Sequence, residues 1–169
     1  ELLNALLSTK DNNDFIILLS QLETRNIRRF MNVLEEFLVS KDIKQNAKTI
    51  ILELLKSQDV NKVVKVRNKE NIIDVDLKEM KNVLDQEEIN LILTKINEIE
   101  NNDDPNYLLY AQDVLFSYSG YIYPELLNNK NINDVSCAIS LYVDSLFNNE
   151  EDFENKVNIY SASLNEVNK

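Results

Sequence analysis

The chain of 169 residues contains no histidine and no tryptophan, and it has one cysteine, one glycine and two prolines. Without histidine, neither a Ser-His-Asp nor a Cys-His catalytic arrangement can form, and no imidazole can bind a metal ion. A single glycine excludes the P-loop and the dinucleotide-binding fingerprint, which need several glycines. The EF-hand loop is also excluded, because no calcium-binding loop pattern contains the glycine that it needs at its centre. The sequence therefore lacks the residues that most familiar enzyme classes require.

The same scarcities bound the fold and the compartment. Few glycines and prolines argue against sandwiches and barrels and favour helices. One cysteine cannot form an internal disulfide, and the longest apolar run, Phe15 to Leu19, is far shorter than the ~20 residues that span a bilayer. The first residues lack a methionine and the pattern of a signal peptide. We therefore expect a cytoplasmic chain that contacts no membrane and forms the C-terminal part of a longer protein.

The formal net charge of −11 is unevenly distributed. Residues 1–70 carry 12 basic and 10 acidic side chains, whereas residues 71–169 carry 6 and 19. A strongly acidic chain is a poor general binder of nucleic acids, because binding depends on neutralising phosphates with lysine and arginine. We interpret the acidic half as a solubilising surface, with attraction of basic partners as the alternative.

Apolar residues recur at steps of three and four along most of the chain, which predicts eight or nine helices. Capping residues suggest several helix starts: Asp11 to Asn13, Thr24 or Arg25, Asp42, Asp85 with Glu88, Asp104 with Pro105, and Asn133 or Asp134. We expect helices in the ranges 1–8, 14–22, 25–38, 43–55, 77–83, 86–99, 105–120, 134–147 and 153–164.

The only strand signal lies near residues 62–76. Two β-branched runs, Val63 to Val66 and Ile72 to Val75, flank a polar stretch and predict a β-hairpin. Because an isolated hairpin is marginally stable in water, it must pack against the helices.

These elements predict an all-α fold of stacked antiparallel helical hairpins, with the β-hairpin as an insertion. The short connections suit an α-solenoid of HEAT or TPR (tetratricopeptide) type, and an irregular closed bundle is the alternative. No composition shift marks a linker, so we expect one helical-repeat domain over residues 1–169.

Several short strings between residues 26 and 80 are shared with a known group of proteins. They are Asn-Ile-Arg-Arg-Phe at 26–30, Lys-Thr at 48–49, Leu-Glu-Leu-Leu at 52–55 with Gln58, and the hairpin; weaker matches follow at 123–124 and 138–147. With these strings the segment resembles an uncharacterised helical-repeat family of low-GC Gram-positive bacteria and mycoplasmas. The chain departs from the family pattern in a hairpin turn without glycine and in Leu77 where a proline is expected. The resemblance implies a helical-repeat fold and a role in association, and it assigns no catalytic residues.

Two sets of basic residues are the main candidates for a binding site: Arg25, Arg28 and Arg29, and Lys41, Lys44 and Lys48. Each set has the spacing that places side chains on one face of a helix. If the two helices are antiparallel neighbours, the two sets would merge into one patch suited to carboxylates or phosphates. A solvated outer face is the alternative interpretation.

All seven tyrosines follow residue 100. Tyrosine suits sites where one end of the side chain is dry and the other wet. Near the break expected at Gly120, Tyr121 and Tyr123 are the best candidates for exposed aromatic anchors, and packing in the core is the alternative.

The remaining reactive groups point to structure rather than chemistry. We expect Cys137 to be a buried structural thiol, with a reactive thiolate near a helix start as the alternative. We expect the carboxylates at 74, 76, 103–104 and 150–152 to cap helices and face solvent rather than to bind a metal ion. No cofactor is expected.

The sequence therefore suggests a non-enzymatic helical-repeat module that binds or scaffolds an unidentified protein or peptide. The first alternative is an RNA- or ribosome-associated factor that uses the same basic patch, and the second is a carboxylate-based metal enzyme. The residues expected to contact a partner are Arg25, Arg28, Arg29, Lys41, Lys44, Lys48, Tyr121 and Tyr123.

Overall fold

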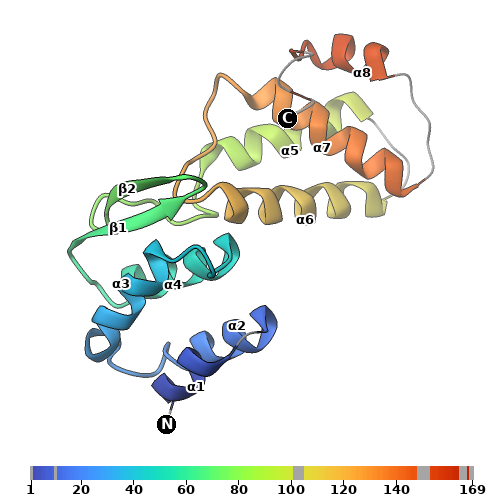
Figure 1. Cartoon of the computed structure of the whole chain (residues 1–169). Helices are drawn as coiled ribbons and strands as arrows, with labels where there is room; N and C mark the ends of the chain where they lie inside the picture. Colours follow the sequence, from blue (N-terminus) through green and yellow to red (C-terminus); the bar gives the residue numbers. More distant parts are fainter. Residues whose placement is uncertain (1, 10, 101–104, 148–152, 164–166, 168–169) are drawn as a thin grey trace. The chain divides into compact units, whose positions relative to one another are not determined.

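The structure, a computed structural model, describes residues 2–9, 11–100, 105–147, 153–163 and 167. Over these residues it contains eight α-helices, one 3₁₀ helix and one two-stranded antiparallel sheet (Figure 1). The mostly helical fold with one hairpin is thus confirmed. The sequence predicts a single domain, whereas the contacts divide the chain into two compact units: residues 1–83 with 120–124, and residues 84–119 with 125–169.

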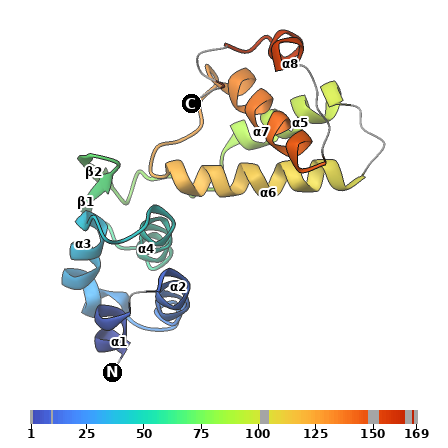
Figure 2. The same cartoon turned by 45° about the vertical axis from the view of Figure 1, so that its right-hand side comes forward.

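The N-terminal unit begins with short stacked helices (Figure 2). They are α1 (Leu2–Ser8), α2 (Asn12–Ser20), the 3₁₀ helix η1 (Ile27–Phe30), α3 (Met31–Val39) and α4 (Gln45–Ser57). Helix α2 contacts both α1 and α4, and α3 contacts α4. Leucines and isoleucines with no exposed surface form the core between them: Leu19, Leu22, Ile27, Leu34, Leu38, Ile51, Leu52 and Leu55.

Helix starts in this unit follow the local capping chemistry in one case and depart from it in others. The Asp11 carboxylate accepts hydrogen bonds from the backbone N–H groups of Asn13 and Asp14, at 2.8 and 3.1 Å, and confirms the predicted start of α2. The predicted cap at Asp42 is wrong. Its backbone N–H donates to the Ser40 hydroxyl at 3.1 Å in a local turn, so that α4 begins only at Gln45.

The third helix starts later than predicted, because Asn26 rather than Thr24 or Arg25 acts as the cap. The Asn26 side chain accepts the backbone N–H of Arg28 at 3.2 Å, and the chain enters η1 before α3.

The hairpin lies where the β-branched residues predict it. Strand β1 (Val63–Asn68) pairs antiparallel with β2 (Asn71–Asp76), with Val63 opposite Asp76. Val64, Val66 and Val75 are buried, and β1 contacts α3. The hairpin is thus supported by the helices, as its marginal intrinsic stability requires.

Residues 77–83 are not a helix, contrary to the prediction. The Asp76 carboxylate accepts the backbone N–H of Lys78 at 3.0 Å, and Glu53 of α4 accepts that of Val83 at 2.8 Å. Leu77 and Met80 are buried. Their helix-like spacing therefore reflects a turn that covers α4 rather than a helical turn.

Residues 120–124 also belong to the N-terminal unit, although they follow residues 84–119 of the C-terminal unit in the chain. The Thr49 hydroxyl donates to the backbone oxygen of Gly120 at 2.7 Å, and the Gln45 amide donates to that of Tyr123. The Tyr123 hydroxyl donates to the backbone oxygen of Lys81 at 2.7 Å. The Tyr123–Pro124 peptide bond is cis. These bonds attach the segment to α4 and to residues 77–83.

The C-terminal unit contains α5 (Glu87–Glu100), most of α6 (Pro105–Ile122), α7 (Ile132–Leu146) and α8 (Phe153–Tyr160). Helix α7 contacts both α5 and α8. Helix α6 continues two residues beyond its predicted end at Gly120, which does not adopt a positive φ. The residue at the N-cap of α7 is Asn131 rather than Asn133 or Asp134. The predicted cap at Asp104 lies outside the described residues.

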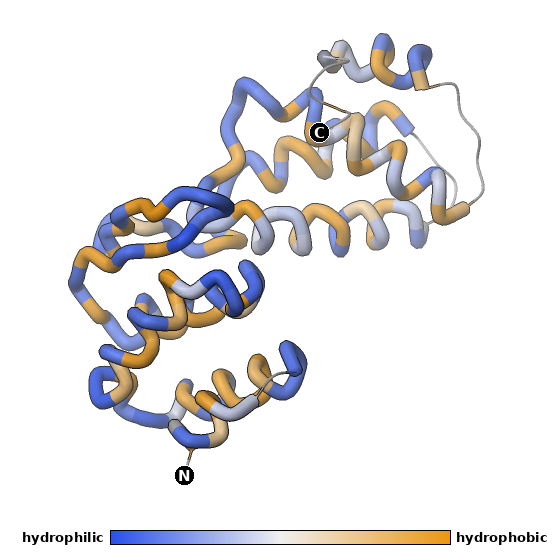
Figure 3. Tube along the Cα trace, in the orientation of Figure 1, coloured by the Kyte–Doolittle hydropathy of each residue, from blue (hydrophilic) through white to orange (hydrophobic). Residues whose placement is uncertain are grey.

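Hydropathy alternates along the helices of both units, as amphipathic helices require (Figure 3). In the described part of the chain, no helix combines the length and the apolar character needed to cross a bilayer.

Candidate functional site

Arg28 and the predicted lysines lie at opposite ends of α4, and Arg25 and Arg29 are exposed. One Arg28 guanidinium nitrogen donates to the backbone oxygens of Gln58 and Asp59, at 2.9 and 3.1 Å, just after the last turn of α4. Arg28 therefore satisfies carbonyl groups at a helix C-terminus, where a cation is favourable. Lys44 and Lys48 belong to the first turn, and a helix of 13 residues is about 20 Å long. The two sets therefore do not merge into one patch.

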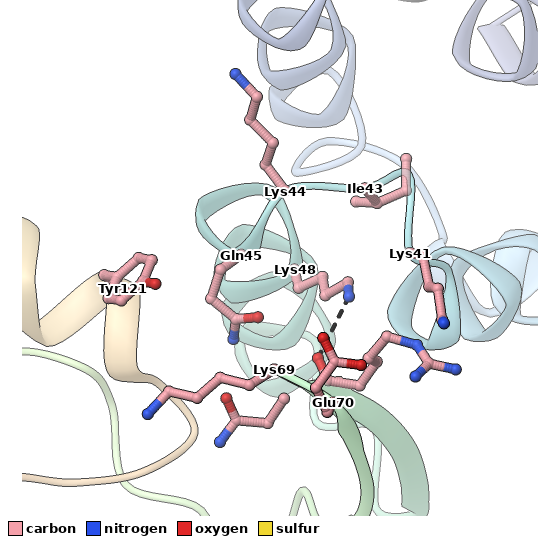
Figure 4. A pocket seen from close by; sticks show the side chains of 10 residues that line it. Lys41, Ile43, Lys44, Gln45, Lys48, Lys69, Glu70 and Tyr121 are labelled. Carbon is pink, nitrogen blue, oxygen red and sulfur yellow. Dashed lines mark hydrogen bonds between the residues drawn. The ribbon is translucent and has the colours of Figure 1, made fainter.

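The lysine set does come together, in a pocket of about 300 Å³ on the N-terminal unit (Figure 4). Lys41 and Lys44 precede α4, Lys48 lies in α4, and Arg67 and Lys69 come from the hairpin. We call this site the cationic pocket; it is also lined by Ile43, Gln45, Asn68, Glu70 and Tyr121. Five cationic side chains thus share a pocket with a single carboxylate, in a chain whose net charge is −11.

Lys48 is the buried member of this group, with 3 % of its surface exposed. Its Nζ donates to the backbone oxygen of Arg67 at 3.3 Å, and it forms no ion pair with any carboxylate of the described residues. Burial lowers the pKa of the Lys48 ammonium, and the nearby charge of Arg67 lowers it further. A buried ammonium with one long hydrogen bond and no ion pair lowers the stability of the fold, because its desolvation is not fully compensated.

The side chains differ in how they face this pocket. In Figure 4 the Lys48 ammonium and the Glu70 carboxylate point into the same space between α4 and the hairpin turn, whereas the Lys44 ammonium extends away from them. Lys41, Lys44 and Lys69 are exposed. The pocket therefore combines one buried cation, Lys48, with three exposed lysines and the half-buried Arg67.

Local backbone structure places the pocket residues. Lys44 stands at the N-cap of α4 and makes no side-chain cap bond, although the Asn46 side chain accepts the backbone N–H of Ala47 within the first turn at 2.9 Å. The Arg67 Nε donates to the backbone oxygen of Val39 at 2.8 Å, which fixes that guanidinium against α3. Lys69 has a φ of 52°, in the left-handed region that glycine adopts most easily.

The two predicted aromatic anchors, Tyr121 and Tyr123, differ in their exposure to solvent. Tyr121 is 60 % exposed and lines the cationic pocket. The expectation that Tyr123 is exposed is wrong, because its surface is fully buried and its hydroxyl is bonded to Lys81. Burial and the neighbouring Glu53 raise the pKa of Tyr123.

The sequence did not indicate the pocket residues that come from the hairpin, which are Arg67, Asn68, Lys69 and Glu70, nor Gln45 of α4. A signal was available, because the predicted turn at 67–71 is rich in charged residues and the hairpin has to pack against helices. What the sequence does not show is which helix end the turn approaches.

A second pocket of about 460 Å³ adjoins the first and shares Ile43 and Lys44 with it. We call it the Phe15 pocket, because the rings of Phe15 and Phe37 meet there edge to face with their centroids 5.1 Å apart. Leu6, Leu7, Thr9, Asp11, Asn12, Ser40 and Asp42 complete its lining. A depression with an aromatic pair and a mixed polar and apolar lining thus lies beside the cationic pocket on the same unit.

The C-terminal unit holds a different group of charges, buried among its four helices. The Lys156 Nζ on α8 donates to Glu100 of α5 at 3.1 Å and to Asp144 of α7. Tyr160 donates to Glu100 at 2.5 Å, and Tyr107 of α6 donates to Asp144 at 2.9 Å. We call these five residues the buried ionic cluster.

The pairing within this cluster indicates a structural role. Burial alone would lower the pKa of Lys156, but the hydrogen bonds and charges of Asp144 and Glu100 outweigh it and raise the pKa. Burial raises the pKa of Tyr107 and Tyr160, helped by Glu100 and Asp144 at Tyr107 and by Glu100 at Tyr160. Because Lys156 faces two carboxylates and each carboxylate also accepts a tyrosine hydroxyl, the cluster ties α8 to the other three helices.

The remaining candidates behave as structural groups. Cys137 is buried, and burial raises its thiol pKa to about 11, which opposes the reactive-thiolate alternative. Within the described residues, no group of three or more metal-ligating side chains comes together. Asp74 and Asp76 are exposed on β2, and the predicted carboxylates at 103–104 and 150–152 lie outside the described residues.

Comparisons of the chain with protein-family models, with curated proteins and with solved structures found no match. The resemblance to the helical-repeat family therefore stays a prediction, and the function has to be argued from the geometry.

Proposed function

We propose that the chain is a non-enzymatic helical-repeat module that binds an acidic segment of a partner protein in the cationic pocket. The observation that carries this proposal is the ammonium of Lys48, buried without an ion pair among the described residues in a pocket that holds four other cations and one carboxylate, that of Glu70. An anionic partner would supply the missing charge, and the surrounding lysines and arginine would strengthen the attraction.

The adjoining Phe15 pocket favours a peptide over a compact small anion. Because both pockets share Ile43 and Lys44, an extended chain a few residues long can place an acidic side chain in one and an apolar side chain in the other. Short stacked helices are the usual framework for such peptide recognition, and we propose that α1 to α4 form HEAT- or TPR-like repeats. The proposed setting is the cytoplasm.

RNA fits the same charges less well. Nucleic-acid binding relies on a row of phosphate contacts, whereas the cations here surround one pocket and Arg28 is bonded at the far end of α4. The net charge of −11 also repels a polyanion.

The test is binding of two nine-residue peptide libraries with randomised flanks, one with three central glutamates and one with three central glutamines. We expect the full chain to bind the glutamate library about tenfold tighter, measured by fluorescence anisotropy. Lys48→Met should remove this preference. Lys65→Met, a change at an exposed lysine of β1 outside the pocket, should leave it intact.

Equal binding of both libraries would refute the acidic-segment proposal. Tight binding of a ten-residue oligouridylate with a steep dependence on salt would replace it with the RNA alternative. Because Lys48 is buried, thermal unfolding of each variant must confirm that it folds. The exposed double variant Lys44→Gln with Lys69→Gln provides a second test of the same pocket.

A further inference from the structure

We propose that the cationic pocket takes the phosphoryl group of a phosphorylated serine or threonine in the partner segment. This inference rests on the proposed function and names the group that the pocket prefers. It is drawn from the number of cations, the donors they leave available and the chemistry of the side chains that supply them.

The charge of the lining exceeds what one carboxylate can balance. Five cations and the single carboxylate of Glu70 leave a formal surplus of four positive charges around about 300 Å³. A glutamate side chain brings one negative charge and two oxygens, whereas a phosphorylated serine brings about −1.5 to −2 and three strong acceptor oxygens. The pocket is therefore better matched to the phosphoryl group.

The donors on the floor of the pocket are also incomplete. The Lys48 ammonium has three N–H donors, and its hydrogen bond to the Arg67 backbone oxygen at 3.3 Å uses one of them. The first turn of α4, with the non-accepting Lys44 at its N-cap, belongs to the same lining. A phosphoryl group beside a buried ammonium and a helix N-terminus receives donors from two directions.

The type of cation fits the same ligand. Four of the five cations are lysines, whose ammonium groups are point charges that approach a tetrahedral phosphoryl group from separate directions. An arginine fork can bind either a carboxylate or a phosphoryl group with two parallel donors, so the preference argued here rests on the lysines. Here the Nε of the single arginine is already bonded to Val39.

Substitution of Glu70 should change phosphopeptide affinity in the opposite direction to substitution of Lys48. It is exposed, it stands in the hairpin turn and its carboxylate faces the same space as Lys48 (Figure 4). A bound phosphoryl group would be repelled by this carboxylate. Glu70→Gln should therefore tighten phosphopeptide binding, whereas Lys48→Met should weaken it.

The experiment compares three nine-residue libraries with identical randomised flanks and phosphoserine, glutamate or serine at the centre. We expect the full chain to bind the phosphoserine library about tenfold tighter than the glutamate library and to bind the serine library weakest. Glu70→Gln should increase phosphoserine affinity roughly threefold. Lys48→Met, or Lys44→Gln with Lys69→Gln, should reduce the phosphoserine preference to less than about twofold.

The pattern of results separates the two proposals. Equal binding of phosphoserine and glutamate, both tighter than serine, would overturn the phosphoryl proposal and leave the acidic-segment proposal standing. Equal binding of all three would overturn both. A phosphoserine preference that survives in Lys48→Met and in the double variant would show that the phosphoryl group binds elsewhere. Inorganic phosphate that competes at the concentration of the phosphopeptide would identify a free phosphate as the ligand instead.

Discussion

At the scale of single residues, Lys48 is unusual because it is a buried lysine without an ion pair among the described residues. A lysine that is 3 % exposed is normally bonded to a carboxylate, as Lys156 is in the C-terminal unit, whereas the hydrogen bond of Lys48 goes to a backbone oxygen and Glu70 shares its pocket without forming an ion pair. Residues that destabilise the fold and line one pocket are typical of binding sites. Lys69, with its positive φ, is a second such residue in the same pocket.

This interpretation predicts that Lys48→Met stabilises the protein while it abolishes anion binding. Methionine has a similar length without the buried charge, so we expect the free energy of unfolding at pH 7 to rise by roughly 1 kcal/mol. Urea denaturation measures the change, and Lys65→Met on the exposed face of β1 serves as the control. A loss of stability in Lys48→Met would instead assign Lys48 to the framework of the fold.

The pH dependence of the same variant has a defined sign. Because the folded-state pKa of Lys48 lies below 10.5, the unfolded chain binds more protons between the two values, and wild-type stability gains with pH in that window. The advantage of Lys48→Met should therefore be largest at neutral pH and should shrink as the pH approaches 10.5.

The sequence anticipated part of this site. The spacing of Lys41, Lys44 and Lys48 indicated a shared face, and the structure brings all three to one pocket although only Lys48 lies within the body of a helix. Arg67 and Lys69 arrive through packing of the hairpin against helices 19 or more residues away in the chain, as the bond from Lys48 to Arg67 illustrates. Such long-range proximity is not encoded in any local spacing.

At the scale of elements, α8 is the helix most dependent on a few polar contacts. It has eight residues, too few to be stable alone, and its buried residues are Lys156, Val157 and Tyr160. Two of these three belong to the buried ionic cluster. The attachment of α8 therefore depends on charges whose pairing is complete only while the helix is docked.

We expect Lys156→Met to destabilise the C-terminal unit by about 3–5 kcal/mol, because it leaves Glu100 and Asp144 buried without their cation. Tyr160→Phe, which removes one hydrogen bond to Glu100, should cost about 1 kcal/mol. Urea denaturation measures both, with Lys130→Met at an exposed site as the control. A neutral effect of Lys156→Met would contradict the structural role of the cluster.

The sign of the pH effect is opposite to that of Lys48. Because the folded-state pKa of Lys156 is raised, its stabilising contribution is complete below 10.5 and is lost as the pH rises through the higher value. The stability difference between wild type and Lys156→Met should stay constant from neutral pH to about 10.5 and decrease above it.

Elements with a strong local signal were predictable, and those shaped by tertiary contacts were not. The Asp11 cap and the two β-branched strands have a clear signal in the local sequence, and both lie where expected. Residues 77–83 have a helical pattern of apolar residues, yet Leu77 and Met80 are buried because the turn covers α4. Lys56 of α4 donates to the backbone oxygen of Met80 and holds this turn in place, which no periodicity reveals.

At the scale of the whole molecule, the two compact units differ in their net charge. The N-terminal unit carries 14 basic and 13 acidic side chains, and the C-terminal unit carries 4 and 16. The cationic pocket thus belongs to the unit without a large negative charge.

The chain path makes the N-terminal unit discontinuous, because residues 84–119 separate its main part from residues 120–124. No linker composition marks this division, which explains why the sequence indicates one domain. Tyr123 supplies the largest buried side chain of the returning segment. The stability of the N-terminal unit therefore depends on a segment that is far in sequence from α4, against which it packs.

We expect Tyr123→Ala to destabilise the N-terminal unit by about 3–5 kcal/mol, because it leaves a cavity beside α4 and removes the bond to Lys81. Amide hydrogen exchange measures the effect residue by residue. Protection should fall in α4 and in residues 77–83, whereas α5 and α7 should keep theirs, because they belong to the other compact unit. Tyr123→Phe, which keeps the ring, should lower protection by about 1 kcal/mol only. A uniform loss of protection across all helices would mean that the two units unfold as one cooperative structure, and unchanged protection in α4 would remove residues 120–124 from the N-terminal unit.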